Sequence, residues 1–168
     1  SPGPFARKFS VREYQLDRDG MSDRQREMFK KQVENARNAQ DKMGACRYIL
    51  PTEFSTSEDG CFFYAKTSFS DEQSLRVVAH KRSFTEHEKF HIISDVAKAL
   101  DFAHSYCVFH RAVSPDNIFI LPDGGASLAN FDFSWFPEHS DAQYTVADDL
   151  AGVKESPYTA PEIAVNDL

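Results

Sequence analysis

Three short segments carry most of the side chains that could do chemistry in this chain of 168 residues. Residues 110–117 read His-Arg-Ala-Val-Ser-Pro-Asp-Asn, residues 132–134 read Asp-Phe-Ser, and residues 160–162 read Ala-Pro-Glu. Asn117 and Asp132 stand fifteen positions apart and carry oxygen atoms of the kind that hard cations such as Mg²⁺ accept. The alternative is that both are turn residues whose side chains hydrogen-bond the nearby backbone.

The order and spacing of these segments resemble those of a protein kinase. The segments are similar to the kinase catalytic loop, the metal-binding triplet and the end of the activation segment, in that order. Kinases carry an aspartate at the position of Ala112, and that aspartate accepts the proton of the substrate hydroxyl. The methyl group of Ala112 cannot take a proton. The resemblance therefore implies a kinase-like fold whose phosphoryl-transfer chemistry is damaged or lost, as in a pseudokinase.

The same resemblance implies a site for ATP and Mg²⁺. Asn117 and Asp132 match the two residues that bind the magnesium ions in kinases. Arg12 falls where kinases have the lysine that holds the nucleotide phosphates, and Glu34, or alternatively Glu27, matches the helix acid that pairs with it. Arginine keeps the positive charge but is longer and forked, so the exchange is not neutral. The alternative is an edge-strand arginine and a solvated glutamate.

Four further positions match structural residues of the family. The resemblance implies that His110 packs under the metal-binding triplet and that Arg111 can hold a phosphorylated activation loop. Phe133 is the second residue of the triplet, and Glu162 closes the activation-segment motif. None of these residues is expected to take part in the chemical step.

The departures from the kinase pattern converge on one site. Besides Ala112 in place of the base, Ser114 replaces the lysine that stabilises the transferring phosphate in Ser/Thr kinases. Ser134 replaces the triplet glycine and so removes easy access to positive φ. Losing a general base typically costs roughly 10²–10⁴-fold in rate, and losing charge stabilisation costs a comparable factor. Asp116 is a nearby carboxylate, but in the family that position faces the structure, so it is a weak candidate for a substitute base.

We therefore expect a pseudokinase module that can still bind ATP and Mg²⁺ and acts as a regulatory or scaffolding domain. Its expected partners are other domains of the same polypeptide or a separate protein. One alternative is an active, atypical serine/threonine kinase that uses Asn117 and Asp132. Another is an interaction domain that binds no nucleotide, in which these two residues are relics.

Composition argues against several other classes of protein. The net charge of −7 and the dispersed Lys and Arg residues do not favour nucleic-acid or anionic-membrane binding. No apolar run approaches the ~20 residues needed to span a bilayer, and the N-terminus has no signal-peptide pattern. Cys46, Cys61 and Cys107 are odd in number and form no CxxC pair, which favours reduced thiols in a cytoplasmic protein.

The length suits one domain of the α+β class. Residues 1–6 read as a linker or a cloning remnant, and residues 7–168 as a partial protein kinase-like domain. Residues 7–70 are expected to form part of the small lobe, with antiparallel strands and one helix. Residues 71–168 are expected to form the first part of a mainly helical large lobe. No glycine-rich loop precedes Arg12, and the helices that would complete the large lobe are missing, so the chain is either an excerpt from a longer protein or a drastically trimmed fold. We expect an excerpt, because the hydrophobic face of the helix 85–106 would otherwise be half uncovered.

Local patterns predict the elements that must position these residues. A capping box at Thr85 to Glu88 marks the start of the strongest helix, and Pro122 to Gly125 marks a hairpin turn. The expected helices are 22–42, 74–80 and 85–106, and the expected strands are 7–16, 47–54, 61–67, 118–121 and 126–130.

Helical spacing also predicts which faces are buried. In the helix 22–42 the narrow apolar stripe comprises Met28, Val33 and Ala36. In the helix 85–106 the expected buried face comprises Phe90, Ile93, Ala97, Leu100 and His104.

Overall fold

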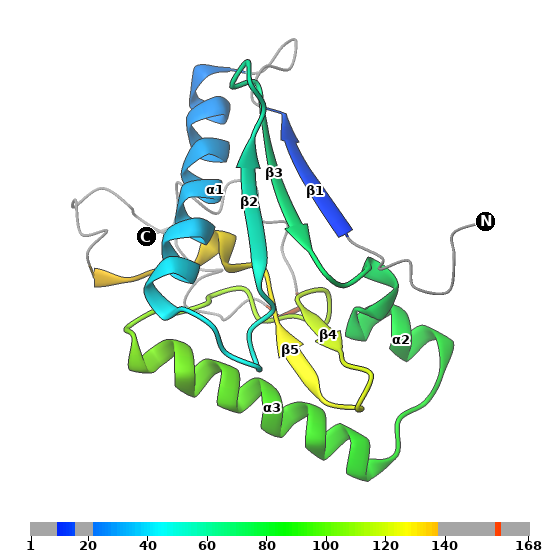
Figure 1. Ribbon diagram of the computed structural model, residues 1–168. Coiled ribbons are helices and arrows are strands. Elements are labelled where there is room, and N and C mark those ends of the chain that lie inside the picture. The colour runs from blue at the N-terminus through cyan, green and yellow to red at the C-terminus, as the bar shows by residue number, and fades with distance from the viewer. Residues whose placement is uncertain (1–9, 16–21, 138–156, 159–168) are drawn as a thin grey trace.

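The computed structural model describes residues 10–15, 22–137 and 157–158. A three-stranded sheet and α1 stand beside each other, and the β4–β5 hairpin lies with α2 and α3 in the other part of the fold (Figure 1). This arrangement confirms the predicted α+β class. The elements are β1 (Ser10–Gln15), α1 (Asp23–Met43), β2 (Thr52–Thr56), β3 (Phe62–Thr67), η1 (Asp71–Gln73), α2 (Leu75–Lys81), α3 (Glu86–Ser105), β4 (Ile118–Ile120), β5 (Ala126–Leu128) and η2 (Phe131–Phe133).

The sheet is antiparallel with the order β1-β3-β2. In β1 the side chains of Ser10, Arg12 and Tyr14 are half-buried while those between them are exposed, because successive strand residues point to opposite faces. Arg12 and Tyr14 therefore share one face of the sheet. Of the predicted strand 7–16, residues 7–9 and 16 lie outside the described part of the chain.

The predicted strand 47–54 is wrong in position, because β2 is Thr52–Thr56. The residues before β2 pair with β5 instead of with β3. Ile49 forms a parallel bridge to Leu128, and the N–H of Leu50 donates to the carbonyl of Leu128 over 2.8 Å. The apolar residues Ile49 and Leu50 suggested that the strand begins before Thr52. These two buried residues instead lie in the segment that connects the two sheets.

The first long helix begins and ends on local signals. The Ser22 hydroxyl accepts the N–H of Gln25, whose side chain accepts the N–H of Ser22 in return, so two otherwise unpaired donors are satisfied. Gly44 ends the helix at φ 70°, a conformation that glycine adopts without strain. The predicted buried stripe is confirmed at Val33 and Ala36, and the side chain of Met28 is outside the description.

The buried face predicted for α3 is wrong. Phe90 is 74% exposed and Ile93 is 66% exposed, and Ala97 and His104 are also exposed while Leu100 is half-buried. The helix instead buries Ile92, Asp95, Ala99 and Ala103. Two apolar faces compete on this helix, and the one rich in alanine lets the backbone approach β5 closely. Thr85 caps the helix as predicted.

The β4–β5 hairpin is confirmed and is tied to α3 by a buried carboxylate. Asp95 is 1% exposed and accepts the N–H of Ala126 at 3.1 Å and the ammonium of Lys98 at 3.2 Å. Gly125 packs against the same carboxylate, and a Cβ at this position would lie 2.7 Å from its Oδ2 atom. Around the hairpin, buried apolar residues of α1, α3, β4 and β5 form one core. In the part of the chain that is described, no helix has the length and apolar character needed to cross a membrane.

Candidate functional site

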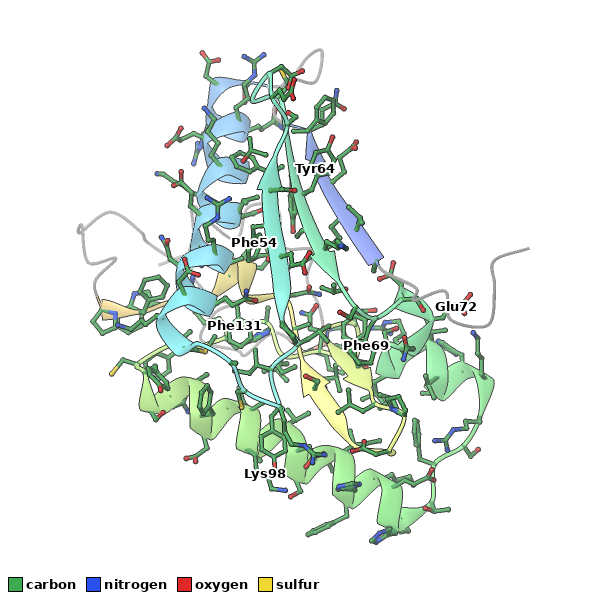
Figure 2. All side chains as sticks on the ribbon, in the orientation of Figure 1. Phe54, Tyr64, Phe69, Glu72, Lys98 and Phe131 are labelled. Atoms are coloured by element: carbon green, nitrogen blue, oxygen red, sulfur yellow. The ribbon has the colours of Figure 1, made fainter. Side chains whose placement is uncertain are left out.

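Asp132 lies in a one-turn helix that the rest of the fold holds in place. Phe131 packs into the core near the C-terminal end of α1 (Figure 2). The Ser134 hydroxyl donates to the carbonyl of Phe131 over 2.8 Å. From α1, the Asn35 amide donates to the carbonyls of Asp132 at 3.1 Å and Ser134 at 2.6 Å. These bonds fix the backbone on both sides of the Asp132 carboxylate.

The structure pairs Arg12 with Asp132 and not with either predicted glutamate. The Arg12 Nη1 atom donates to Oδ2 of Asp132 over 2.9 Å, and its Nη2 atom donates to Oδ1 of Asn130 over 2.5 Å. Glu34 and Glu27 are exposed on α1. The position of Arg12 in β1 instead brings its guanidinium within hydrogen-bonding distance of the Asp132 carboxylate and the Asn130 amide oxygen.

Tyr14 is a second donor to the same carboxylate, and sequence reasoning gave it no role. Its hydroxyl donates to Oδ2 of Asp132 over 2.9 Å. Burial raises the pKa of Tyr14 well above its usual value, and the negative charge of Asp132 raises it further. The hydroxyl therefore stays protonated and donates at neutral pH. The alternation of β1 was the available signal, since it puts Tyr14 on the same face as Arg12.

The two predicted metal-binding residues belong to one hydrogen-bond network. The Nδ2 atom of Asn130 donates to Oδ1 of Asn117 over 2.6 Å, and the Arg12–Asn130 bond links both to Asp132. The Nδ2 atom of Asn117 donates to the carbonyl of Ala112 over 2.7 Å. Asn130 has φ 65°, a left-handed conformation that asparagine tolerates better than most residues. The sequence offered little to distinguish it from a turn residue.

His110 packs beneath the triplet as a neutral ring. It is 2% exposed, and its ring meets that of Phe131 edge-on at 4.6 Å between centroids. The N–H of Ala112 donates to Nδ1 of His110 over 3.2 Å, so Nε2 carries the proton that is donated to the carbonyl of Ala129 over 2.8 Å. Burial lowers the pKa of His110 to about 4. The ring therefore joins the catalytic-loop segment to the triplet without a charge.

Arg111 contacts the triplet from the other side. It has φ 60°, and its Nε atom donates to the carbonyl of Phe133 over 2.7 Å. Two consecutive residues thus support the triplet: His110 packs against Phe131, and Arg111 binds the carbonyl of Phe133. Glu162 lies outside the described residues, so its predicted place stays a prediction.

The departures from the kinase pattern occupy the same loop. Ala112 places a methyl group where kinases have the base, and both of its backbone polar groups are used inside the site. The carbonyl of Ser114 accepts the N–H of Asn117 over 3.0 Å in a tight turn. Asp116 forms a two-pronged ion pair with Arg76 of α2, at 2.5 Å and 2.8 Å. Hydrogen bonds from Arg76 lower the pKa of Asp116 below its usual value, and this makes it a poor base.

Asn117 and Asp132 suit Mg²⁺ in donor type, but the oxygen atoms described above already accept hydrogen bonds. Asn130 donates to Asn117, while Arg12 and Tyr14 donate to Asp132. A cavity of only about 10 Å³ lies beside Arg12, Asn130 and Asp132, which is room for about one water molecule. Across the described residues, no group of three or more His, Cys, Asp or Glu side chains could hold a metal ion. Binding at Oδ2 of Asp132 therefore requires its two present donors to leave, because they use both of its lone pairs.

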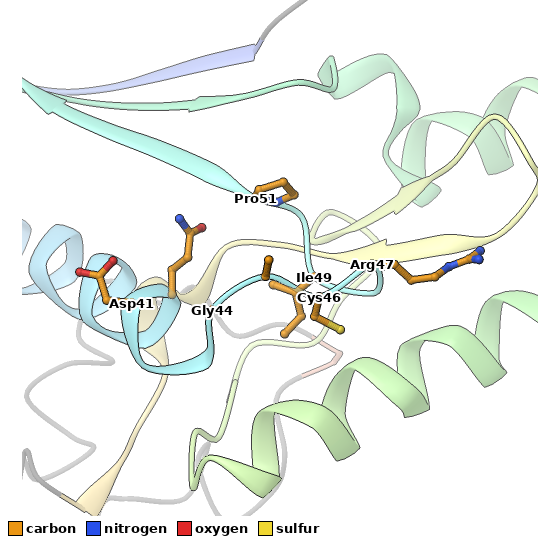
Figure 3. A pocket seen from close by; sticks show the side chains of 8 residues that line it. Asp41, Gly44, Cys46, Arg47, Ile49 and Pro51 are labelled. Carbon is orange, nitrogen blue, oxygen red and sulfur yellow. The ribbon is translucent and has the colours of Figure 1, made fainter.

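A larger pocket of about 460 Å³ lies at the connection between α1 and β2 (Figure 3). It is lined by Gln40, Asp41, Gly44, Ala45, Cys46, Arg47, Ile49 and Pro51. None of these residues belongs to the predicted site. The pocket therefore gives no support to the nucleotide-binding prediction.

Comparisons with known proteins agree with the geometry. The family model for the protein kinase domain matches residues 21–167. The serine/threonine-protein kinase PTK2 of Candida glabrata is 32% identical over 116 residues, which cover 68% of this chain and 15% of that protein. The cAMP-dependent protein kinase catalytic subunit 3 of Drosophila melanogaster is 24% identical over 135 residues, covering 79% of this chain and 22% of that protein.

A third relative is the dual specificity protein kinase zak2 of Dictyostelium discoideum, which is 27% identical over 131 residues, covering 76% of this chain and 20% of that protein. The chain thus spans about a fifth of the length of these relatives. The family match starts after β1, so Arg12 and Tyr14 lie outside it, but it includes the whole catalytic-loop and triplet region. On a match of this extent, together with the packing of that region around His110, the chain belongs to the protein kinase domain family.

Proposed function

We propose that this chain is part of a pseudokinase module, which retains a site for ATP and Mg²⁺ and regulates or scaffolds other domains or a protein partner. The observation that carries the proposal is Ala112 at the position of the kinase base. Its N–H donates to His110 and its carbonyl accepts from Asn117. The backbone at this position is therefore held by two hydrogen bonds, while its side chain cannot accept a proton.

The surroundings of Ala112 support the proposal, because Asp116 and Asp132 already bind other side chains. Asp116 is held by Arg76, and Asp132 is held by Arg12 and Tyr14. Hydrogen bonds from Arg76 lower the pKa of Asp116 below its usual value. Proton removal from a substrate hydroxyl would therefore lack help from Asp116.

Retention of a nucleotide site is supported by the two surviving ligand residues. When bound, Mg²⁺ would neutralise charge on the nucleotide phosphates. Asp132 and Asn117 would hold that ion, and Arg12 would lie near the phosphates. The Asn35 and Ser134 contacts keep the backbone around Asp132 in place. Asp132 is therefore already positioned to bind the ion, although Arg12 and Tyr14 now donate to its carboxylate.

The test is calorimetric titration of Mg²⁺-ATP into the protein and into the Asp132→Ala variant. Asp101→Ala, on the exposed surface of α3, is the matched control. We expect binding that is lost in Asp132→Ala and kept in Asp101→Ala. Radiolabelled ATP with a panel of protein substrates should give no phosphate transfer. Transfer that disappears in Asp132→Ala would contradict the pseudokinase proposal.

The second candidate is an active, atypical serine/threonine kinase. It is favoured by the presence of both Asn117 and Asp132 and by the kinase names of the relatives. The same radiolabel assay decides between the two proposals. A third candidate, an interaction domain without nucleotide, is favoured by the donors that fill the site. In that case Mg²⁺-ATP would leave the melting temperature of the protein unchanged.

A further inference from the structure

We propose that Tyr14, together with Arg12, forms an autoinhibitory contact that closes the Asp132 site against a metal-bound nucleotide. The inference rests on the proposed nucleotide site and concerns what regulates it. We call Arg12, Tyr14, Asn130 and Asp132 the Asp132 cluster. Neither Tyr14 nor Asn130 has an expected role in holding nucleotide or metal, and of these two it is Tyr14 that donates to the Asp132 carboxylate.

The strand geometry explains why the contact exists. Arg12 and Tyr14 are two residues apart in β1, and they pair with Ala65 and Phe63 of β3. Both side chains point to the face of the sheet that meets η2. The Arg12 Cζ atom lies 5.6 Å from the centre of the Tyr14 ring, so the ring also supports the guanidinium. The two donors then meet on a single atom, Oδ2 of Asp132.

Partial burial of the Asp132 cluster reduces the competition of water with these hydrogen bonds. The side chain of Asp132 is 11% exposed and that of Arg12 is 38% exposed. A guanidinium has donors and no acceptor, and its charge repels a second cation at the same oxygen. An ion that binds Oδ2 must therefore displace Arg12 and must also break the hydrogen bond from Tyr14.

Tyr14 gives the cleaner experiment, because Arg12 is expected both to close the site and to contact phosphate. Replacing Tyr14 by phenylalanine keeps the ring and removes only the hydroxyl. Hydrogen bonds to charged groups are strong enough that losing one should make binding at Asp132 roughly tenfold tighter. We call the arrangement in which Arg12 and Tyr14 bind Asp132 the closed state, and the arrangement without these contacts the open state. Tyr14→Phe removes a hydrogen bond from the closed state alone, so it shifts the equilibrium toward the open state.

Tyr64→Phe is the matched control. Tyr64 lies in the neighbouring strand β3 (Figure 2) and pairs with Glu13. Directly paired residues share a face, so Tyr64 points to the opposite face of the sheet from Tyr14. The two variants remove the same atom from adjacent strands, and only one of them touches Asp132.

The measurement is the affinity for Mg²⁺-ATP by calorimetry, with the melting temperature of the ligand-free protein recorded for each variant. Roughly tenfold tighter binding in Tyr14→Phe, with Tyr64→Phe like the unchanged protein, supports the inference. Binding that appears only in Tyr14→Phe supports it as well. Equal affinity in all three proteins overturns the inference and leaves the proposed nucleotide site standing.

Two other outcomes also count against the autoinhibitory contact. A lower melting temperature in Tyr14→Phe with weaker or unchanged binding means that the hydroxyl is only structural. Absence of binding in every variant overturns both the autoinhibitory contact and the proposed nucleotide site. The two failures are therefore distinguishable by whether the unchanged protein binds.

Discussion

Acidification should destabilise this protein through His110, and the structure gives the size of the effect. The buried ring has a pKa of about 4, compared with 6.5 for an ordinary histidine. Between these two values the unfolded chain binds a proton that the folded chain does not bind. The free energy of unfolding therefore falls as the pH drops below about 6.5, and this loss is complete near pH 4. Above about pH 6.5 the contribution of His110 is constant.

The magnitude follows from the difference between the two pKa values. Each pKa unit is worth about 1.4 kcal/mol, so His110 accounts for a loss of about 3 kcal/mol across the whole range. That is a large fraction of the ~5–15 kcal/mol that stabilises a typical domain. The loss should be visible well before the carboxylates are fully protonated.

The assay is equilibrium urea unfolding of the protein and of His110→Gln at several pH values between about 7.5 and 4.5. Glutamine can still donate to the carbonyl of Ala129 but does not titrate. His110→Gln should be less stable at neutral pH, because it loses its contact with the Phe131 ring, yet its stability should fall less on acidification. The control is His80→Gln, on the exposed surface of α2, which should retain the full pH dependence.

Equal pH dependence in the protein and in His110→Gln would refute the reasoning. It would mean that the ring is protonated as readily in the folded chain as in the unfolded one. A histidine that accepts the N–H of Ala112 and lies against Phe131 could not behave in that way without a rearrangement of the triplet.

Three further substitutions test the packing that supports the site. Gly125→Ala should cost about 1–3 kcal/mol in urea unfolding, because the new Cβ lies 2.7 Å from Oδ2 of Asp95. Thr85→Ala should cost about 1 kcal/mol in thermal unfolding through the lost cap of α3. Gln40→Ala should cost about 1–3 kcal/mol in urea unfolding, because the Gln40 amide binds both the N–H and the carbonyl of Thr52.

Nearby exposed positions are the controls for the Gln40 and Thr85 variants. Asn38→Ala lies on α1 close to Gln40, and Ser83→Ala lies just before the cap of α3. Both should change stability by less than about 0.5 kcal/mol. An effect of Gln40→Ala or Thr85→Ala no larger than that of its control would show that the corresponding hydrogen bonds are replaced by water at no cost.

Elements with local signals could be predicted from the residue types alone. The start of the first helix at Ser22, the capping box at Thr85 and the turn glycine Gly124 lie where the pattern predicted them. Each of these features depends on backbone groups a few residues apart, so the residue types are sufficient. The spacing from His110 to Asp132 likewise identified the protein kinase family.

The choice between the two apolar faces of α3 depends on how the helix packs against the rest of the fold. Phe90 and Ile93 are at least as hydrophobic as Ile92 and Ala99, so helical spacing offered two solutions. The contact with β5 selected the face with small side chains, since close approach of the backbones favours alanine. The position of β2 was decided in the same way, because the preceding residues bind β5.

The partners of the site residues were also decided by the tertiary structure. Arg12 and Asp132 are 120 positions apart, and no local pattern says that they meet. The resemblance to kinases paired Arg12 with Glu34, or alternatively with Glu27, whereas the folded chain brings Tyr14 and Asn130 to the same network as Arg12. A charged side chain binds whichever group the packed elements bring within reach. Residue types therefore showed which chemistry the chain could keep, and the hydrogen bonds that Arg12 and Tyr14 donate to Asp132 determined which atoms occupy the site.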